Sequence, residues 1–418
     1  MNLTTLDKAA LEARRDELES SYEALKAAGL ALDLTRGKPS AEQLDLSNAM
    51  DGIPGGEFRL QDGTDVRNYG GLLGIPEARA LGAAIMGALP AEVMAGGNSS
   101  LNLMFHYVAH MMPTWLETSE DIRFLCPVPG YDRHFTICEH LGIEMLTVPL
   151  NADGPDMDII EKMASEDPAI KGIWCVPKYS NPTGDTYSEA VVKRFANLGT
   201  VAGEHFRIFW DNAYSVHHLA DTPDVLADLL PLAKEAGTAD SVVMFASTSK
   251  VTFAGAGVAF LGTSADNLAA FEKYMAAQAI GFDKVNQLRH VRFLRDMEGV
   301  AEHMAKHRAI VEPRFNCVQE KLAPLKDAGI ATWTAPNGGY FISLDTLPGL
   351  ATEVVSMAGD AGVKLTPAGA TFPYGEDPEN TNIRIAPTFP SMEELAKAMD
   401  AFVVCLELAS VRQLLTNK

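Results

Sequence analysis

The chain has 418 residues, 47% of them hydrophobic and 21% charged, and its 34 basic against 55 acidic side chains give a formal net charge of −21. This length and composition are typical of a globular protein with two or three domains. So acidic a surface argues against binding to nucleic acid or to an anionic membrane, and an anionic small molecule would need a local basic pocket.

The five cysteines are spread along the chain without a Cys-x-x-Cys pair. This spacing argues against a disulfide framework or a zinc site, so no metal is expected and a reducing cytoplasm is favoured. The N-terminal residues 1–30 are typical of a charged amphipathic helix rather than a signal peptide. No stretch reaches the ~18 apolar residues that a membrane span requires.

The first predicted element is a helix over residues 4–29, which is followed by a break at Gly37 and Pro39 and by a helical pattern over 75–89. From about residue 95 onward, short apolar runs alternate with helical stretches. The apolar runs cover 122–126, 144–150, 172–177, 206–211, 241–247 and 257–262, with helices between them, for example near 188–200 and 222–236. This alternation predicts a mostly parallel sheet with helices on both faces.

The pattern changes after about residue 290. A long helix and four shorter elements are predicted there, at about 284–326, 338–344, 350–361, 382–387 and 391–413. We therefore predict an α/β protein in which residues 49–295 form a large domain. Residues 296–418 would form a smaller α+β domain, to which the N-terminal segment 1–48 contributes.

Polar side chains follow three of the apolar runs. Asn181 lies in "NPTG" after the third run, Asp211 and Tyr214 lie in "DNAY" at the end of the fourth, and Lys250 ends "STSK" after the fifth. Ligands of open parallel sheets bind at the carboxyl ends of the strands, so these side chains are expected to converge. Taken singly, each of these residues also has a purely structural interpretation. The sequence "NPTG" is then a turn, Asp211 is a helix cap, and Lys250 is a solvated side chain.

Together, in this order, the four groups match the requirements of pyridoxal phosphate (PLP). The lysine amine can form a Schiff base with the cofactor's aldehyde, and the carboxylate can keep the pyridine nitrogen protonated. The amide and the phenol can donate hydrogen bonds to the ring oxygen. The combination therefore predicts a PLP site.

With these residues the chain resembles the fold-type I PLP-dependent aminotransferases of class I over almost its whole length. It is most similar to the bacterial aspartate aminotransferase-like subgroup. The motifs that carry the resemblance are "GGNSSLNLM" (96–104), "CPVPGYDRHF" (126–135), "YSNPTGDTYS" (179–188) and "STSKVTFAGAG" (247–257). The resemblance implies a homodimer with active sites at its interface and transamination between an L-amino acid and a 2-oxo acid.

The resemblance also implies a role for each strand-end residue. Lys250 would carry the cofactor and then act as the base, and Asp211 would pair with the ring nitrogen. Asn181 and Tyr214 would contact the ring oxygen. Tyr131 would stack on the ring face, and its alternative role is that of a core tyrosine.

The cofactor's phosphate is expected on the loop of Gly97, Asn98 and Ser99, because a helix follows and backbone N–H groups at a helix N-terminus favour a phosphate. Ser247 would add a hydroxyl group. Without a ligand the same loop would be a glycine turn with serine caps. The resemblance further implies that Tyr69 reaches the phosphate of the partner subunit.

One position departs from the family. Many members have an arginine eight residues after the lysine that pairs with the phosphate, whereas this chain has Val258 there. Lys284, Arg289 and His290 are available instead, and we expect Lys284 near the phosphate. An arginine restored at position 258 is expected to leave the fold intact.

Arg384 in "NIRIAPTF" would hold the substrate's α-carboxylate in a two-bond pair that lysine cannot reproduce. Its alternative is an outward-facing strand arginine. In "LTRGKPS" Gly37 would lie near the same carboxylate, while Arg36 and Lys38 would suit a distal carboxylate or belong to an exposed loop. Asn181 would also contact substrate. Aspartate with 2-oxoglutarate is the expected pair.

Parts of the sequence are compatible with other activities. The same residues would serve a PLP-dependent lyase or decarboxylase, because the Cα bond perpendicular to the ring decides the reaction. A non-catalytic ligand sensor would need a DNA-binding domain and a basic surface, but only about 30 residues precede "LTRGKPS". A nicotinamide dehydrogenase would need G-x-G-x-x-G, and "GAGVAF" (255–260) lacks the third glycine.

Overall fold

The computed structural model describes residues 2–35 and 37–418, and its largest sheet has eight strands. In spatial order they are β2 (Val93–Ala95), β9 (Ala259–Thr263), β8 (Val242–Ser247), β7 (Arg207–Asp211), β6 (Ile170–Cys175), β3 (Arg123–Val128), β4 (Glu144–Asn151) and β5 (Gly154–Pro155). β8, β7, β6, β3 and β4 run parallel, whereas β9 is antiparallel to β8 and to β2, and β5 is antiparallel to β4. The prediction of a mostly parallel sheet is therefore confirmed.

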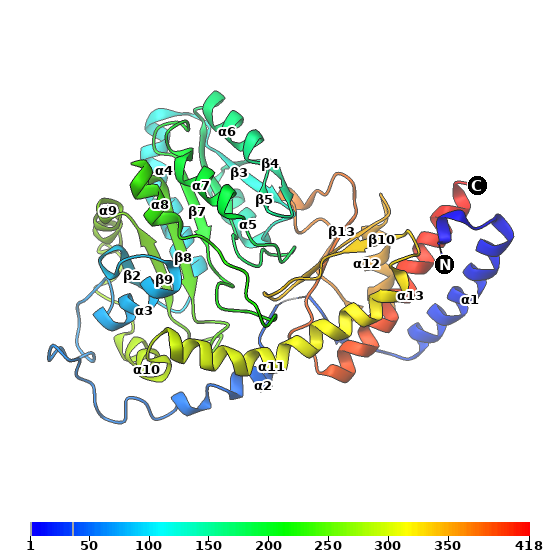
Figure 1. Cartoon of the computed structure of the whole chain (residues 1–418), viewed down its shortest axis with the longest axis horizontal. Coiled ribbons are helices and arrows are strands. Elements are labelled where there is room, and N and C mark those ends of the chain that lie inside the picture. Colours follow the sequence, from blue (N-terminus) through cyan, green and yellow to red (C-terminus); the bar gives the residue numbers. More distant parts are fainter. Residues whose placement is uncertain (1, 36) are drawn as a thin grey trace.

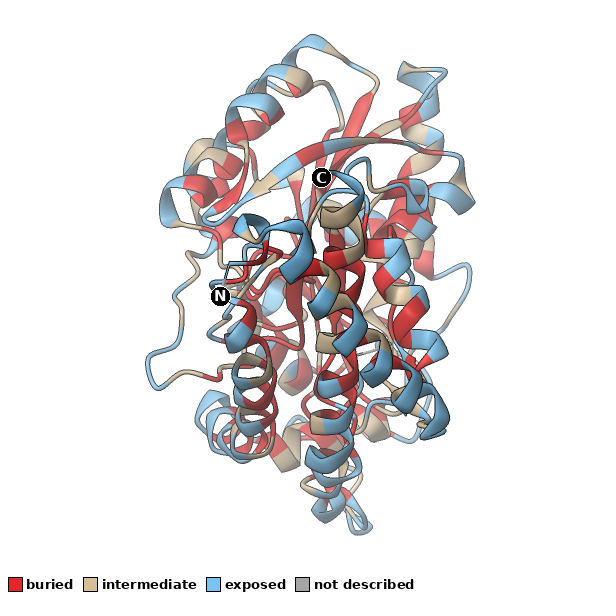
Figure 2. Ribbon diagram, turned by 90° about the vertical axis from the view of Figure 1, so that its right-hand side faces the viewer, coloured by how far each residue is buried: buried red, intermediate tan, exposed pale blue. Residues whose placement is uncertain are grey.

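Helices cover both faces of this sheet (Figure 1). One face packs against α4 (Ser100–Thr118), α5 (Asp132–Leu141) and α9 (Ala265–Met275). The other packs against α3 (Pro76–Met86), α6 (Met157–Glu166), α7 (Glu189–Leu198) and α8 (Leu229–Ala236). Successive residues of β7 alternate between the two, since Phe209 joins the first cluster and its neighbours Ile208 and Trp210 join the second. Figure 2, seen from the side of the molecule that carries both termini, shows helices that are red on their inner faces and pale blue on their outer faces.

A second, smaller core combines the two ends of the chain. It contains the antiparallel sheet β10 (Ala331–Trp333), β11 (Ile342–Thr346) and β13 (Asn382–Ile385), and the parallel pair β1 (Leu32–Asp33) and β12 (Val363–Lys364). Helices α1 (Lys8–Ala27), α12 (Ala351–Asp360) and α13 (Met392–Thr416) pack on it, and α1 lies beside α13 in Figure 1. The limits at residues 48 and 295 stay a prediction.

The long helical stretch predicted over 284–326 is two helices, α10 (Lys284–Leu294) and α11 (Met297–Leu322). Arg295 separates them with a left-handed backbone (φ 65°), and Asp296 caps α11 by accepting a 2.9 Å hydrogen bond from the Gly299 N–H. Figure 1 shows α11 running beneath both sheets with the short α2 (Ala41–Asp45) alongside. This helix therefore joins the two cores.

Short 3-10 helices complete the described chain: Leu3–Thr5, Asn48–Met50, Pro90–Glu92, Ala239–Ser241, Ala323–Leu325 and Pro373–Gly375. All five cysteines are buried and free. Across residues 2–35 and 37–418, none of the helices combines the length and the apolar character needed to cross a membrane.

Candidate active site

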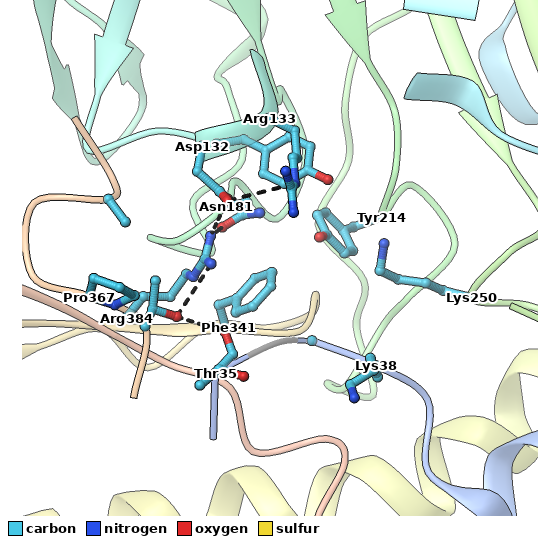
Figure 3. A pocket seen from close by; sticks show the side chains of 14 residues that line it. Thr35, Lys38, Asp132, Arg133, Asn181, Tyr214, Lys250, Phe341, Pro367 and Arg384 are labelled. Carbon is cyan, nitrogen blue, oxygen red and sulfur yellow. Dashed lines mark hydrogen bonds and ion pairs between the residues drawn. The ribbon is translucent and has the colours of Figure 1, made fainter. Parts of the chain in front are cut away.

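A cavity of about 560 Å³ lies where the carboxyl ends of the parallel strands face the smaller sheet. Figure 3 shows Lys250 and Tyr214 on one side of it and Arg384, with Asp132 and Asn181, on the other. Its lining residues come from the N-terminal segment, the start of α5, three strand ends, the smaller antiparallel sheet and the segment after β12: Thr35, Gly37, Lys38, Tyr131, Asp132, Arg133, Asn181, Tyr214, Lys250, Phe341, Thr366, Pro367, Ala370 and Arg384.

A smaller cavity adjoins the first and extends it toward the end of β7. It is lined by Asp211, by the first residues of α4 (Ser100, Leu101 and Met104), by Val176 and Ala213, and by four residues shared with the main cavity: Tyr131, Asn181, Tyr214 and Lys250. The four strand-end groups predicted from the sequence thus surround one continuous space.

Lys250 follows β8, and its Nζ lies 5.0 Å from the centroid of the Tyr214 ring. Burial lowers the pKa of the Lys250 ammonium, and the negative charge of Asp211 opposes that shift. An amine with a lowered pKa is more readily neutral near pH 7, and only the neutral amine acts as a nucleophile or base. Burial also raises the pKa of the Tyr214 phenol, which therefore stays a hydrogen-bond donor.

The Asp211 carboxylate is buried and only half satisfied. Its Oδ2 lies 3.2 Å from His134 Nε2, and that imidazole is stacked on Trp174 with 4.3 Å between ring centroids. Its Oδ1 has no exposed surface and no hydrogen-bond partner. Asn181 shows the same feature, because its Nδ2 is buried without a partner. Such groups are costly unless a ligand pairs with them.

The N-terminus of α4 closes the other end of the smaller cavity. Ser99 caps the helix by accepting a hydrogen bond from the Asn102 N–H at 3.3 Å. Asn98 Nδ2 donates to the Gly255 carbonyl at 2.9 Å, which ties the loop that contains Gly97 to the loop after Lys250. The first-turn N–H groups of a helix have no partners within the helix, so they suit an anion.

Ser247 ends β8 close to this loop. Its Oγ lies 2.7 Å from Ser249 Oγ, which in turn donates to the Asn98 carbonyl at 3.2 Å. Two hydroxyl groups therefore stand beside the N-terminus of α4, and each donates its hydrogen to an acceptor of the protein.

The donors and acceptors of the smaller cavity fit PLP. Asp211 Oδ1 offers an unpaired acceptor for a protonated ring nitrogen, and Asn181 Nδ2 offers an unpaired donor for a ring oxygen. Lys250 supplies the amine, and the N-terminus of α4 supplies the phosphate donors. Tyr131 lines both cavities, as a ring-stacking residue must.

Arg384 lies on β13, with its side chain only 5% exposed. Its Nη1 donates to Asp132 Oδ1 at 3.0 Å and to Asn181 Oδ1 at 3.2 Å, and its Nη2 donates to Thr366 Oγ1 at 3.4 Å. The guanidinium also lies 4.9 Å from the centroid of the Phe341 ring. The arginine therefore faces the cavity and not the outer side of the sheet.

The N-terminal segment forms one wall of the main cavity. A Cβ added at Gly37 would lie 2.6 Å from Phe341 Cζ, so any other residue here would require the Phe341 ring to move. Lys38 Nζ lies 4.4 Å from the Phe389 ring centroid and lines the cavity. Arg36, predicted to contact a distal carboxylate, falls outside the described residues.

Two predicted cofactor residues lie apart from these cavities. Tyr69 is 86% exposed, and Lys284 is buried with its Nζ donating to the Gly70 carbonyl. Val258 is 1% exposed within the apolar cluster between the sheet and α3. Its burial argues against the expectation that an arginine there would leave the fold intact.

Sequence reasoning missed Asp132, Arg133 and His134, although all three stand in the quoted "GYDRHF" motif. An acidic residue in the first turn of a helix is an ordinary stabilising feature, so Asp132 carried no separate signal. The position of the helix at a strand end, directly after Tyr131, was the available clue.

Three comparisons place the chain among known proteins. The family described as aspartate amino-transferase matches residues 6–418. A protein of Corynebacterium glutamicum named aspartate aminotransferase is 45% identical over 420 residues, which cover 98% of this chain and 96% of that protein. The crystal structure of an aspartate transaminase from Corynebacterium glutamicum has a TM-score of 0.95 and 44% identity, covering 99% of both chains.

A more distant structure supports the fold alone. LysN, an α-aminoadipate aminotransferase of Thermus thermophilus, has a TM-score of 0.74 at 22% identity, covering 93% of this chain and 94% of its own. That protein was solved with N-(5'-phosphopyridoxyl)-L-leucine.

Proposed function

This chain belongs to the aspartate amino-transferase family, and from that premise we propose that it transfers the amino group of an acidic amino acid, aspartate first, to a 2-oxo acid such as 2-oxoglutarate, with PLP as its cofactor. Aminotransferase activity itself follows from the family. The observation that carries the PLP assignment is the pair of unpartnered buried atoms, Asp211 Oδ1 and Asn181 Nδ2, beside Lys250.

PLP, when bound, supplies the electron sink of the reaction. Asp211 would keep the ring nitrogen protonated, with His134 holding the second oxygen of the carboxylate. Asn181 Nδ2 and the protonated Tyr214 hydroxyl would donate to the ring oxygen. The first turn of α4 would hold the phosphate.

Lys250 would move the proton. Its Nζ, with a pKa lowered by burial, is suited to remove the proton from the substrate's Cα. The same Nζ would then donate that proton to the carbon atom from which Lys250 has been displaced. Arg384 would hold the α-carboxylate from the opposite wall, so that the substrate is fixed between the two side chains.

The charge of the cavity supports an acidic substrate. Among the described residues that line it, Lys38, Arg133 and Arg384 are cationic apart from the amine of Lys250, and Asp132 is acidic. This balance is opposite to that of the whole chain, which carries −21. Lys38 is the group we assign to the distal carboxylate.

We further propose a homodimer located in the cytoplasm. Tyr69 cannot serve its own cavity while 86% exposed, so it is free to reach a partner's phosphate. Lys284 Nζ donates to the carbonyl of Gly70, the residue after Tyr69, so Lys284 would also lie near the partner's phosphate. The five buried free thiols fit a reducing compartment.

Nitrogen transfer can be followed directly. The purified protein with PLP, ¹⁵N-aspartate and 2-oxoglutarate should yield ¹⁵N-glutamate in equal amount to the aspartate consumed, as measured by NMR. Release of the label as ammonium would point to a lyase, and release of carbon dioxide to a decarboxylase. Either result would overturn the proposal.

A further inference from the structure

The arginine assigned to the substrate's α-carboxylate already carries a carboxylate from the chain itself. Asp132 Oδ1 lies 3.0 Å from Arg384 Nη1, and both residues line the main cavity. Figure 3 shows this pair at the wall opposite Lys250. The two residues are 252 positions apart, one on α5 and the other on β13.

Three N–H groups of Arg384 already donate hydrogen bonds within the protein, so few remain for an incoming carboxylate. A guanidinium has five N–H bonds. Both on Nη1 are used, for Asp132 and Asn181, and one on Nη2 goes to Thr366. The Nε has no hydrogen-bond partner. A carboxylate that pairs end-on with Nη1 and Nη2 must therefore take the place of one Nη1 partner.

Asp132 is the partner able to leave. Its side chain is 31% exposed, whereas Asn181 is only 2% exposed. A second cation is also within reach, because Asp132 Oδ2 lies 3.9 Å from Arg133 Nε. Asp132 begins α5, so the N-terminal end of that helix favours its charge in either position.

We infer that Asp132 is an internal stand-in for the substrate carboxylate: it holds Arg384 in the free enzyme and yields it to substrate by moving to Arg133. The inference rests on the proposed role of Arg384. The exchange keeps every charge paired, so the buried arginine is never left without a counter-ion. Return of Asp132 to Arg384 then favours release of product. Asp132 is thus a residue that sets substrate affinity.

The effect of removing the Asp132 charge on the affinity for a dicarboxylate tests this inference. Succinate has two carboxylates but no amino or oxo group, so it binds without reacting. Titration calorimetry on the PLP-loaded protein should show that Asp132→Asn binds succinate ~10-fold more tightly, because a competing charged contact is lost. The KM for aspartate should fall with it, while kcat does not rise. Unchanged or weaker succinate binding would overturn the inference, since Asp132 would then only order Arg384.

Two controls separate competition from a general charge effect. Glu42→Gln removes a carboxylate from another buried arginine, Arg314, outside the cavity, and should leave succinate binding unchanged. Arg133→Gln should weaken succinate binding several-fold in the wild-type background, because the cavity loses a cation and Asp132 loses its second partner. In the Asp132→Asn background the loss should be clearly smaller, because only the cavity charge is then removed, and an equal loss in both backgrounds would overturn the inference.

Failure of the proposed function is distinguishable. If Arg384→Lys binds succinate as the wild type does, Arg384 does not receive the carboxylate and both ideas fall. If Arg384→Lys weakens binding while Asp132→Asn leaves it unchanged, the function stands and the stand-in role of Asp132 is wrong.

Discussion

Lowering the pH from about 7.5 to about 5.0 should cost this protein ~2 kcal/mol of stability through His307 alone. This histidine lies on α11, beneath the loop that carries Lys250. Its Nδ1 accepts a hydrogen bond from Gln43 Nε2 at 3.2 Å, and its Nε2 lies 3.2 Å from His303 Nε2. His303 in turn donates to the Val251 carbonyl at 2.8 Å.

The direction of this pH effect on stability follows from the direction of the pKa shift of His307. Burial, and next the neighbouring His303, lower the pKa of His307 from 6.5 to about 4. Between these values the unfolded chain binds a proton that the folded chain does not, so the free energy of unfolding rises with pH. The stabilisation is complete above pH 6.5 and is lost as the pH falls toward 4. The full effect is on the order of 3 kcal/mol, of which ~2 kcal/mol is lost at about pH 5.0.

Urea unfolding at the two pH values measures the difference. His307→Gln should lose ~2 kcal/mol less than the wild type on acidification, because glutamine does not titrate. The exposed His140 provides a control, and His140→Gln should keep the wild-type pH dependence. If the wild type and His307→Gln lose the same free energy, the buried neutral histidine is not the cause.

Arg384→Lys should lower kcat/KM for aspartate ~30- to 1,000-fold, because a two-bond carboxylate pair is worth ~2–4 kcal/mol and lysine cannot form it; a loss below about threefold in steady-state assays would contradict this. Val258→Arg should destabilise the fold by more than ~3 kcal/mol in urea, because it places a charge in an apolar cluster, and unchanged stability would refute that placement. Tyr69→Phe should raise the dissociation constant for PLP ~5-fold in fluorescence titrations by removing one hydrogen bond, and an unchanged constant would exclude its role at a partner's phosphate.

The sequence was most informative where an apolar run of strand length is followed directly by polar residues. Apolar runs buried on both faces mark β6, β7 and β8, and the polar residues that follow them have to meet at one sheet edge. That reasoning led to Asn181, Asp211 and Lys250 without any knowledge of the three-dimensional arrangement. The motif resemblance then added Arg384 and Gly37, which line the same cavity.

Other features depend on contacts between distant segments. The break at Arg295 has no glycine or proline to mark it, so the helical period continues across it. The Asp132–Arg384 pair joins α5 to β13, and its chemistry becomes visible only when both elements face one cavity. Val258 directly precedes β9, and the alternation of side chains there places Val258 in the apolar cluster between the sheet and α3.

The central claim is that Lys250 is the amine that carries the cofactor. The PLP-loaded protein can be reduced with borohydride, digested and analysed by mass spectrometry. The account predicts the pyridoxyl mass on Lys250 alone, and none after Lys250→Ala. Label on another buried lysine, such as Lys178 or Lys284, or none on the wild-type protein, would contradict it.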